Sequence, residues 1–192
     1  MSRFGGRLRG SQAVSGWLRG GGGGVSSVQR NTITIASGAT SNTATLSPAV
    51  DVSRSRIVFL GLTDAGGDTT VDKSACRVAL TDGTTVTATV GATGTGNRIV
   101  AFEVIEYRPG VIRYLKRGTV TTTAATSGTD TVAVADTTKA TTDYLGFTSD
   151  FSGAAVPGNS QCRVVLTNAT TVTATGLGGL NRTVGYQVVE FY

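Results

Sequence analysis

The second half of this chain repeats the first, and the repeat limits the possible folds more than any other feature. The segments Cys76–Thr81 and Cys162–Thr167 share the pattern Cys-Arg-Val-x-Leu-Thr, and Thr84–Thr89 matches Thr170–Thr175 residue for residue. Four further matches follow in the same order: Arg30–Thr34 with Arg117–Thr121, Leu60-Gly61 with Leu145-Gly146, Asn97-Arg98 with Asn181-Arg182, and Phe102–Tyr107 with Tyr186–Phe191. Ordered matches of this kind predict two copies of one small structural unit.

The limits of the two copies follow from the first and last matches. We expect one copy at residues 28–107 and the other at 115–192, with a short linker at 108–114. Pro109-Gly110 inside this linker is typical of a turn. Residues 1–27 lie outside the repeat, and five consecutive glycines at 20–24 predict a flexible N-terminal arm.

Alternation within each copy predicts strands. Cys76, Val78 and Leu80 fall on one face of a strand and Arg77 on the other. The threonine- and valine-rich composition also favours strands, and no segment has a helical period. Further strands of the first copy are expected at 32–35, 43–46, 56–60, 84–89 and 99–107, which makes about six strands per copy.

The last of these strands, at 99–107, is apolar on both faces, so we expect it to be central or to lie at a subunit interface. Asp82-Gly83 predicts a two-residue type I′ hairpin turn, and Asn168-Ala169 stands at the same place in the second copy. The sequence therefore predicts an all-β protein, with two tandem homologous small β-sandwich or barrel-like domains behind the flexible arm.

The net charge of +5 is concentrated on the arm. Residues 1–30 contain five arginines and no acid, and the remaining 12 Lys and Arg are balanced by 12 Asp and Glu. The arm also holds the only tryptophan. We considered a plain flexible tail, phosphate contacts with nucleic acid, and an anchor that orders on a partner protein. We favour the anchor, because tryptophan and arginine are frequent binding anchors. The expected docking residues are Arg3, Phe4, Arg7, Leu8, Arg9, Trp17, Leu18 and Arg19.

Candidate chemical sites are few. Cys76 and Cys162 occupy matched positions on apolar faces, so we expect core residues rather than nucleophiles. Glu106 and Glu190 also match, and we expect strand-end salt bridges or interface contacts. The acidic stretch Asp64–Asp72 lacks EF-hand spacing, so a solvated loop is expected there and a calcium site is the weaker alternative. Without histidine, we expect no enzyme, no metal site and no cofactor.

Two segments and two motifs together resemble small repeat domains encoded in the structural-gene regions of tailed bacteriophages and prophages. They are Val28–Ile35, Leu60-Gly61, Arg163–Ala174 and Tyr186–Phe191. Asn31, where this pattern usually has glycine, and the Asp64–Asp72 insertion depart from it. The resemblance implies a virion component near the tail, neck or fibre. We expect it to dock on other virion proteins through its arm and to form homo-oligomers through its β domains.

Two alternatives stay open at this point: a capsid decoration protein and a carbohydrate-binding adhesin module. No apolar run is long enough to span a membrane, and the N-terminus has no secretory signal pattern. We therefore expect synthesis in the host cytoplasm, and the resemblance implies a final location in the virion.

Overall fold

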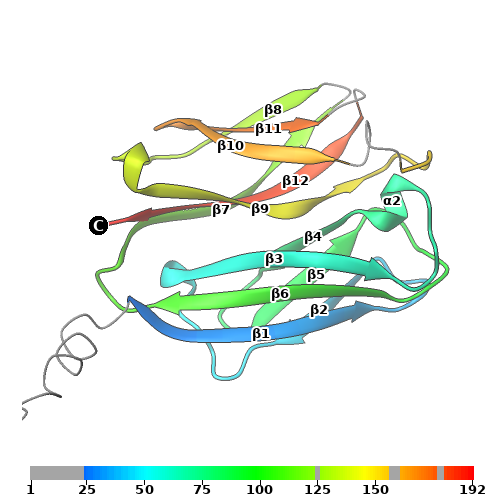
Figure 1. Ribbon diagram of the computed structural model, residues 1–192, viewed down its shortest axis with the longest axis horizontal. Coiled ribbons are helices and arrows are strands. Elements are labelled where there is room, and N and C mark those ends of the chain that lie inside the picture. Colours follow the sequence, from blue (N-terminus) through cyan, green and yellow to red (C-terminus); the bar gives the residue numbers. More distant parts are fainter. Residues whose placement is uncertain (1–23, 124–125, 156–160, 177–179) are drawn as a thin grey trace, which may run out of the picture.

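The computed structural model describes residues 24–123, 126–155, 161–176 and 180–192, and the protein is all-β, as the sequence predicts (Figure 1). The first six strands are β1 (Val25–Ile35), β2 (Ser41–Thr45), β3 (Ser55–Asp64), β4 (Cys76–Leu80), β5 (Thr85–Val90) and β6 (Arg98–Tyr107). The other six are β7 (Ile112–Thr122), β8 (Ser127–Thr131), β9 (Ala140–Ser149), β10 (Cys162–Asn168), β11 (Thr171–Gly176) and β12 (Arg182–Phe191). We call residues 25–107 the first repeat and residues 112–192 the second repeat.

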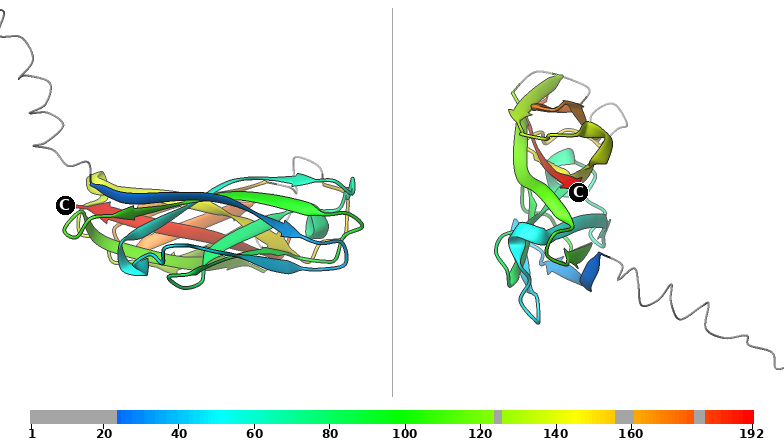
Figure 2. Two further views of the ribbon diagram at one scale, coloured as in Figure 1. Left: turned by 90° about the horizontal axis from the view of Figure 1, so that it is seen from below. Right: turned by 90° about the vertical axis from the view of Figure 1, so that its left-hand side faces the viewer.

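Both repeats have the same strand order. In the first repeat the antiparallel sheet β1–β6–β3 packs against β2–β5–β4. In the second, β7–β12–β9 packs against β8–β11–β10. The strands run along the long axis of the molecule, and the two repeats lie side by side across it (Figure 2). The long apolar strands β6 and β12 are central in their three-strand units, which confirms the central position predicted for 99–107.

The two repeats are joined by more than the chain connection. A bridge between Arg77 of β4 and Gly146 of β9 makes β2–β5–β4 continuous with β9–β12–β7, so a six-stranded sheet runs through both repeats. Each apolar core also takes side chains from the other repeat: Leu145 packs in the first core, and Val71 and Ala75 pack in the second. The independence of the two expected domains therefore stays a prediction.

The first strand of each repeat begins before the expected limit. β1 begins at Val25, inside the expected arm, because Val25 still pairs with Tyr107. β7 begins at Ile112, inside the expected linker, because Ile112 pairs with Phe191. The connection is thus shortened to 108–111. It is a tight turn in which Gly110 has a φ of 81° and the Val111 amide donates to the Arg108 carbonyl at 3.3 Å.

The Asp82-Gly83 connection is not the predicted two-residue turn. β4 and β5 are separated by residues 81–84, and Gly83 does not have a positive φ. Instead, Asp82 Oδ1 accepts hydrogen bonds from the Thr84 amide and hydroxyl at 2.7 and 2.8 Å. Asn168 Oδ1 accepts the equivalent pair from Thr170 at 2.9 and 3.0 Å, so a side-chain turn is what the two copies share.

Among the described residues, helical structure is confined to short segments, although the sequence predicted none. They are η1 (Val52–Arg54), η2 (Thr137–Lys139) and α2 (Val71–Ser74). Both 3₁₀ turns begin after a capping aspartate, Asp51 and Asp136, whose side chain accepts from a backbone amide two residues on. Over the residues described, no helix is long and apolar enough to cross a bilayer.

Candidate docking surfaces

The Leu-Gly pair shared by the repeats forms a β-bulge in each of them. In the first repeat, Phe59 and Gly61 face consecutive residues of β6, so Leu60 has no partner in the ladder. In the second repeat, the pairing of β9 with β12 shifts at the matched place, next to Leu145 and Gly146. Both glycines have positive φ values, 127° for Gly61 and 84° for Gly146, which explains why glycine follows leucine in both copies.

Leu145 of the second repeat packs into the apolar core of the first repeat. Its side chain is 3% exposed and belongs to the apolar core of the first repeat, together with Val78 and Cys76 of β4. Gly146 allows this approach, because a Cβ at that position would lie 2.0 Å from the Cys76 carbonyl oxygen. The bulge therefore places a leucine at the edge of a sandwich to which it does not belong in sequence.

A polar network lies beside this apolar contact. Arg56 of β3 donates from Nε to Asp143 Oδ2 of β9 at 2.7 Å, and its Nη2 also contacts Asp143. Gln187 of β12 donates to the same Asp143 oxygen at 2.9 Å. The Gln187 side-chain oxygen Oε1 accepts from Arg117 Nε at 2.9 Å and from the Ile57 amide at 3.2 Å. One chain of hydrogen bonds thus connects the edge of β3 to the face of β7–β12–β9.

Burial and charge act differently on the two arginines of this network. The hydrogen bond to Asp143 raises the pKa of Arg56 above its ordinary value. Burial lowers the pKa of Arg117 to about 10, because its guanidinium has no carboxylate to offset the loss of water. Arg117 instead donates to backbone carbonyls of the first repeat, at Ser55 and, at 3.0 Å, at Val52.

The corresponding surface of the first repeat is not covered by any part of the chain that the structure describes. We call it the open face, and it consists of Val28, Arg30, Val58, Leu60, Ile99 and Glu103 on the outer side of β1–β6–β3. Leu60, the counterpart of Leu145, is 55% exposed. Val28 and Ile99 are also among the exposed large apolar residues. Exposed apolar side chains that gather on one sheet face are a known feature of protein contact surfaces.

The polar pair on the open face also has a counterpart at the inter-repeat contact. Arg30 Nε lies 2.5 Å from Glu103 Oε2, with the Arg30 side chain largely exposed. The pairing registers make Arg30 equivalent to Arg117 and Glu103 equivalent to Gln187. Val58 stands opposite Glu103 as Asp143 stands opposite Gln187. The open face therefore has the same leucine and arginine as the buried contact, but it has Val58 where the buried contact has Asp143.

The second repeat has an uncovered edge of its own at β10, which ends the order β10–β11–β8. Its inward residues Cys162, Val164 and Leu166 are only partly buried, whereas their counterparts Cys76, Val78 and Leu80 are 4, 1 and 8% exposed. We call Cys162, Arg163, Val164, Val165 and Leu166 the open edge. A cavity of about 320 Å³ lies beside it, against Gln161, Cys162, Arg163, Thr175 and Gly176.

The two cysteines pack as the sequence predicts. Cys76 is buried in the first core, Cys162 packs against the second, and both are free thiols. Burial raises the pKa of each thiol to about 11, which leaves little thiolate at neutral pH.

Glu106 and Glu190 make the expected strand-end contacts. Glu106 Oε1 lies 2.7 Å from Arg54 Nη2 and accepts from the Asp51 amide at 3.2 Å. Glu190 Oε1 accepts from the Asp136 amide at 2.8 Å. In both repeats the matched glutamate thus fixes the start of the 3₁₀ turn.

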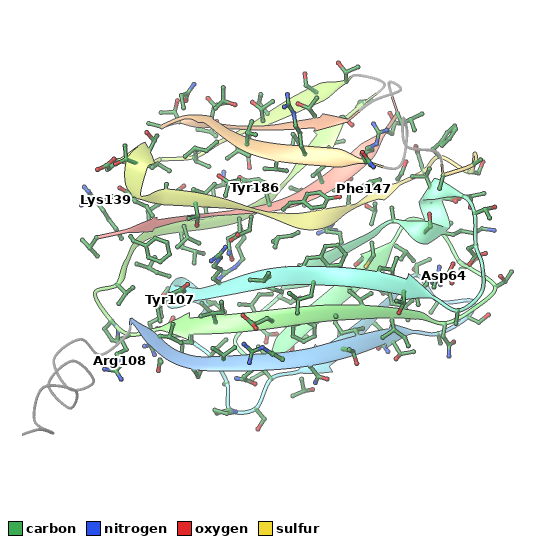
Figure 3. All side chains as sticks on the ribbon, viewed as in Figure 1. Asp64, Tyr107, Arg108, Lys139, Phe147 and Tyr186 are labelled. Atoms are coloured by element: carbon green, nitrogen blue, oxygen red, sulfur yellow. The ribbon has the colours of Figure 1, made fainter. Side chains whose placement is uncertain are left out.

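The acids at the start of the Asp64–Asp72 stretch are engaged in local hydrogen bonds. Asp64 accepts from the Gly66 and Asp68 amides, each at 2.8 Å, and Asp68 accepts from Thr95. The stretch begins at the end of the molecule opposite Arg108 (Figure 3). In the parts of the chain that the structure describes, no group of three metal-ligating side chains occurs.

All eight docking residues expected in the arm lie in 1–23, outside the described residues: Arg3, Phe4, Arg7, Leu8, Arg9, Trp17, Leu18 and Arg19. In the sequence, Leu60-Gly61 and Leu145-Gly146 stand out only as markers of the repeat, and nothing in the motif identifies them as contact residues. Arg56, Asp143 and Gln187 were also missed. Comparison with known protein families, curated proteins and solved structures found no match to this chain.

Proposed function

We propose that the chain is a structural component of a tailed-phage virion that docks through its arm and assembles through its β surfaces. The observation that carries the assembly role is the exposure of Leu60 on the open face, where the matched Leu145 is covered by a neighbouring sandwich. A leucine that is buried by protein in one copy and exposed in the other indicates a surface made for contact.

The location in a virion is supported by the resemblance of the repeat motifs to phage structural domains. The arm fits such a role, since its charge and its aromatic residues are separate from a body whose charges nearly balance, with 13 Lys and Arg against 12 Asp and Glu. A tail, neck or fibre-attachment protein would be present in few copies per particle, and a decoration protein in hundreds.

Quantitative mass spectrometry of purified particles tests the proposal. The full chain should be found in the particle, and a chain lacking residues 1–24 should be folded but missing from it. A matched control replaces only Gln12 and Ser15 of the arm by alanine, which keeps the arginines and Trp17. Normal incorporation of the truncated chain would contradict docking through the arm, and the absence of the full chain from particles would contradict the virion role.

A further inference from the structure

The two surfaces that form the contact between the repeats each have a matched copy elsewhere in the chain. Within the chain, the β4 edge of the first repeat receives Leu145 and Gly146 from β9 of the second. By the repeat, β10 of the second repeat is the counterpart of β4, and the Leu60-Gly61 bulge of the first is the counterpart of Leu145-Gly146. Each half of a second contact of the same kind is therefore present, but the two halves do not meet within one chain.

We propose that two copies of the chain form a dimer in which the open edge of each packs on the open face of the other. Leu60 then takes the place beside Val164 that Leu145 has beside Val78. Arg163 pairs with the partner's Gly61 as Arg77 pairs with Gly146. The inference deepens the proposed function, because it names a second copy of this chain as the occupant of the open face.

The exposure of matched residues supports this occupant on both sides of the contact. Leu60 is exposed where Leu145 is buried, and Cys162, Val164 and Leu166 are part-exposed where Cys76, Val78 and Leu80 are buried. Gly61 shows the same difference, since a Cβ there would meet nothing within 4 Å, whereas a Cβ at Gly146 would meet a carbonyl oxygen of β4. The space that β4 fills beside Gly146 is empty beside Gly61.

The positions of the two surfaces favour a closed dimer over a filament. β1, β6 and β3 lie in front of β2, β5 and β4 in Figure 1, so the open face points toward the viewer. β9 and β10 lie in front of β7 and β8, so the open edge points the same way. Two chains that face each other across a two-fold axis can therefore use both surfaces at once. This makes two identical contacts and leaves neither surface uncovered.

The dimer contact is more apolar than the contact it copies. The positions of Arg56 and Asp143 are taken by Thr141 and Val58 in the duplicate, so the ion pair between the repeats is not reproduced. Arg30 remains, and it can reach backbone carbonyls of the partner as Arg117 reaches those of Val52 and Ser55. Without the ion pair, we expect an association weaker than the fixed contact within the chain and therefore dependent on concentration.

Sedimentation velocity of the full chain over about 1–100 µM tests the dimer, because this range brackets the micromolar dissociation constants of weak, reversible associations. We expect a monomer–dimer equilibrium whose dissociation constant rises more than about tenfold in Leu60→Lys, because the ammonium would be buried beside Arg163. Val165→Lys, on the open edge, should have the same effect. The matched control is Val52→Lys, since Val52 is 39% exposed in η1 and lies outside both surfaces.

Alkylation of the two thiols gives an independent measurement. Cys162 of the wild-type chain should react more slowly as the protein concentration rises, while in Leu60→Lys its rate should stay constant. Cys76 is buried in either state and serves as the internal reference. The inference is overturned by a monomer at every concentration, by Leu60→Lys dimerising like the wild type, or by species larger than a dimer. None of these outcomes depends on incorporation into particles, so the virion role is tested separately.

Discussion

Arg56 and Asp143, which are 87 residues apart in sequence, hold the two repeats together through a hydrogen bond of 2.7 Å between Nε and Oδ2. Asp143 also accepts from Gln187, so it is bonded on both sides of the contact. The side chains of both partners are mostly buried. A part-buried pair of this kind fixes the relative position of two structural units more strongly than a surface ion pair does.

Asp143→Asn should lower the free energy of unfolding by about 1–3 kcal/mol, because Arg56 would keep its burial but lose its charged partner. Urea unfolding followed by circular dichroism measures the change. The matched control is Glu103→Gln, which removes the charge of the Arg30–Glu103 pair, whose arginine is largely exposed to solvent, and should cost about 0–1 kcal/mol. Equal losses in the two variants would show that the Arg56–Asp143 pair does not hold the repeats together.

Leu145→Ala should destabilise the first repeat, although Leu145 belongs to the second. Removing this buried side chain leaves a cavity in the first core and should cost about 2–4 kcal/mol. Hydrogen exchange locates the effect, and we expect faster exchange in β4 than in β11. Leu60→Ala, at the matched exposed position, serves as the control and should change stability by less than about 0.5 kcal/mol at concentrations where the chain is monomeric.

The repeat and the alternation of apolar residues were enough to predict the all-β fold and the number of strands. They did not predict how the copies meet, because the motif Leu-Gly is identical in both and alternation does not show which neighbour covers a leucine. The signal lay where the copies differ. Val58 stands where the second repeat has Asp143, and Glu103 stands where it has Gln187. These two differences distinguish the open face from the matched face that is bonded to the other repeat.

The predicted type I′ turn after β4 was wrong for a related reason. Asp-Gly favours a type I′ turn in an isolated hairpin, but the structure brings Gly83 close to the backbone of another segment. A Cβ at Gly83 would lie 2.6 Å from the Val50 carbonyl oxygen, and the Val50 amide donates to the Gly83 carbonyl at 2.8 Å. The Gly83 backbone is thus held against Val50 by a long-range contact that a local turn signal does not contain, and in the second repeat the Ala169 carbonyl accepts the equivalent bond from the Val134 amide at 2.9 Å.

Gly146→Ala should be more destabilising than Gly61→Ala. Both residues have positive φ values, so both substitutions strain the backbone by about 1–2 kcal/mol. Only at Gly146 would the new methyl group also overlap the Cys76 carbonyl oxygen and push β9 away from β4. Thermal unfolding of the two variants at low protein concentration should separate them, and equal unfolding temperatures would contradict a close contact at Gly146.

The stability of the second repeat should depend on the ionisation of Asp130. Tyr186 Oη donates to Asp130 Oδ2 at 2.5 Å, and Lys116 Nζ lies 3.1 Å from the same oxygen. The hydrogen bond from Tyr186 is the largest of the effects that lower the pKa of Asp130 below its ordinary value of 3.8. A lowered pKa in the folded state means that the unfolded chain takes up the proton first as the pH falls.

The contribution of Asp130 is therefore fully present above about pH 4 and is lost as the pH falls through its folded pKa. The free energies of unfolding of the wild type and of Asp130→Asn should differ at pH 6 and should converge toward pH 2–3. Asp82→Asn shows how much of such a pH dependence comes from local hydrogen bonds alone, because the Thr84 amide and hydroxyl lower the pKa of the exposed Asp82 within its own turn. A difference between wild type and Asp130→Asn that stays constant from pH 6 to pH 2 would show that the carboxylate charge is not what Tyr186 and Lys116 recognise.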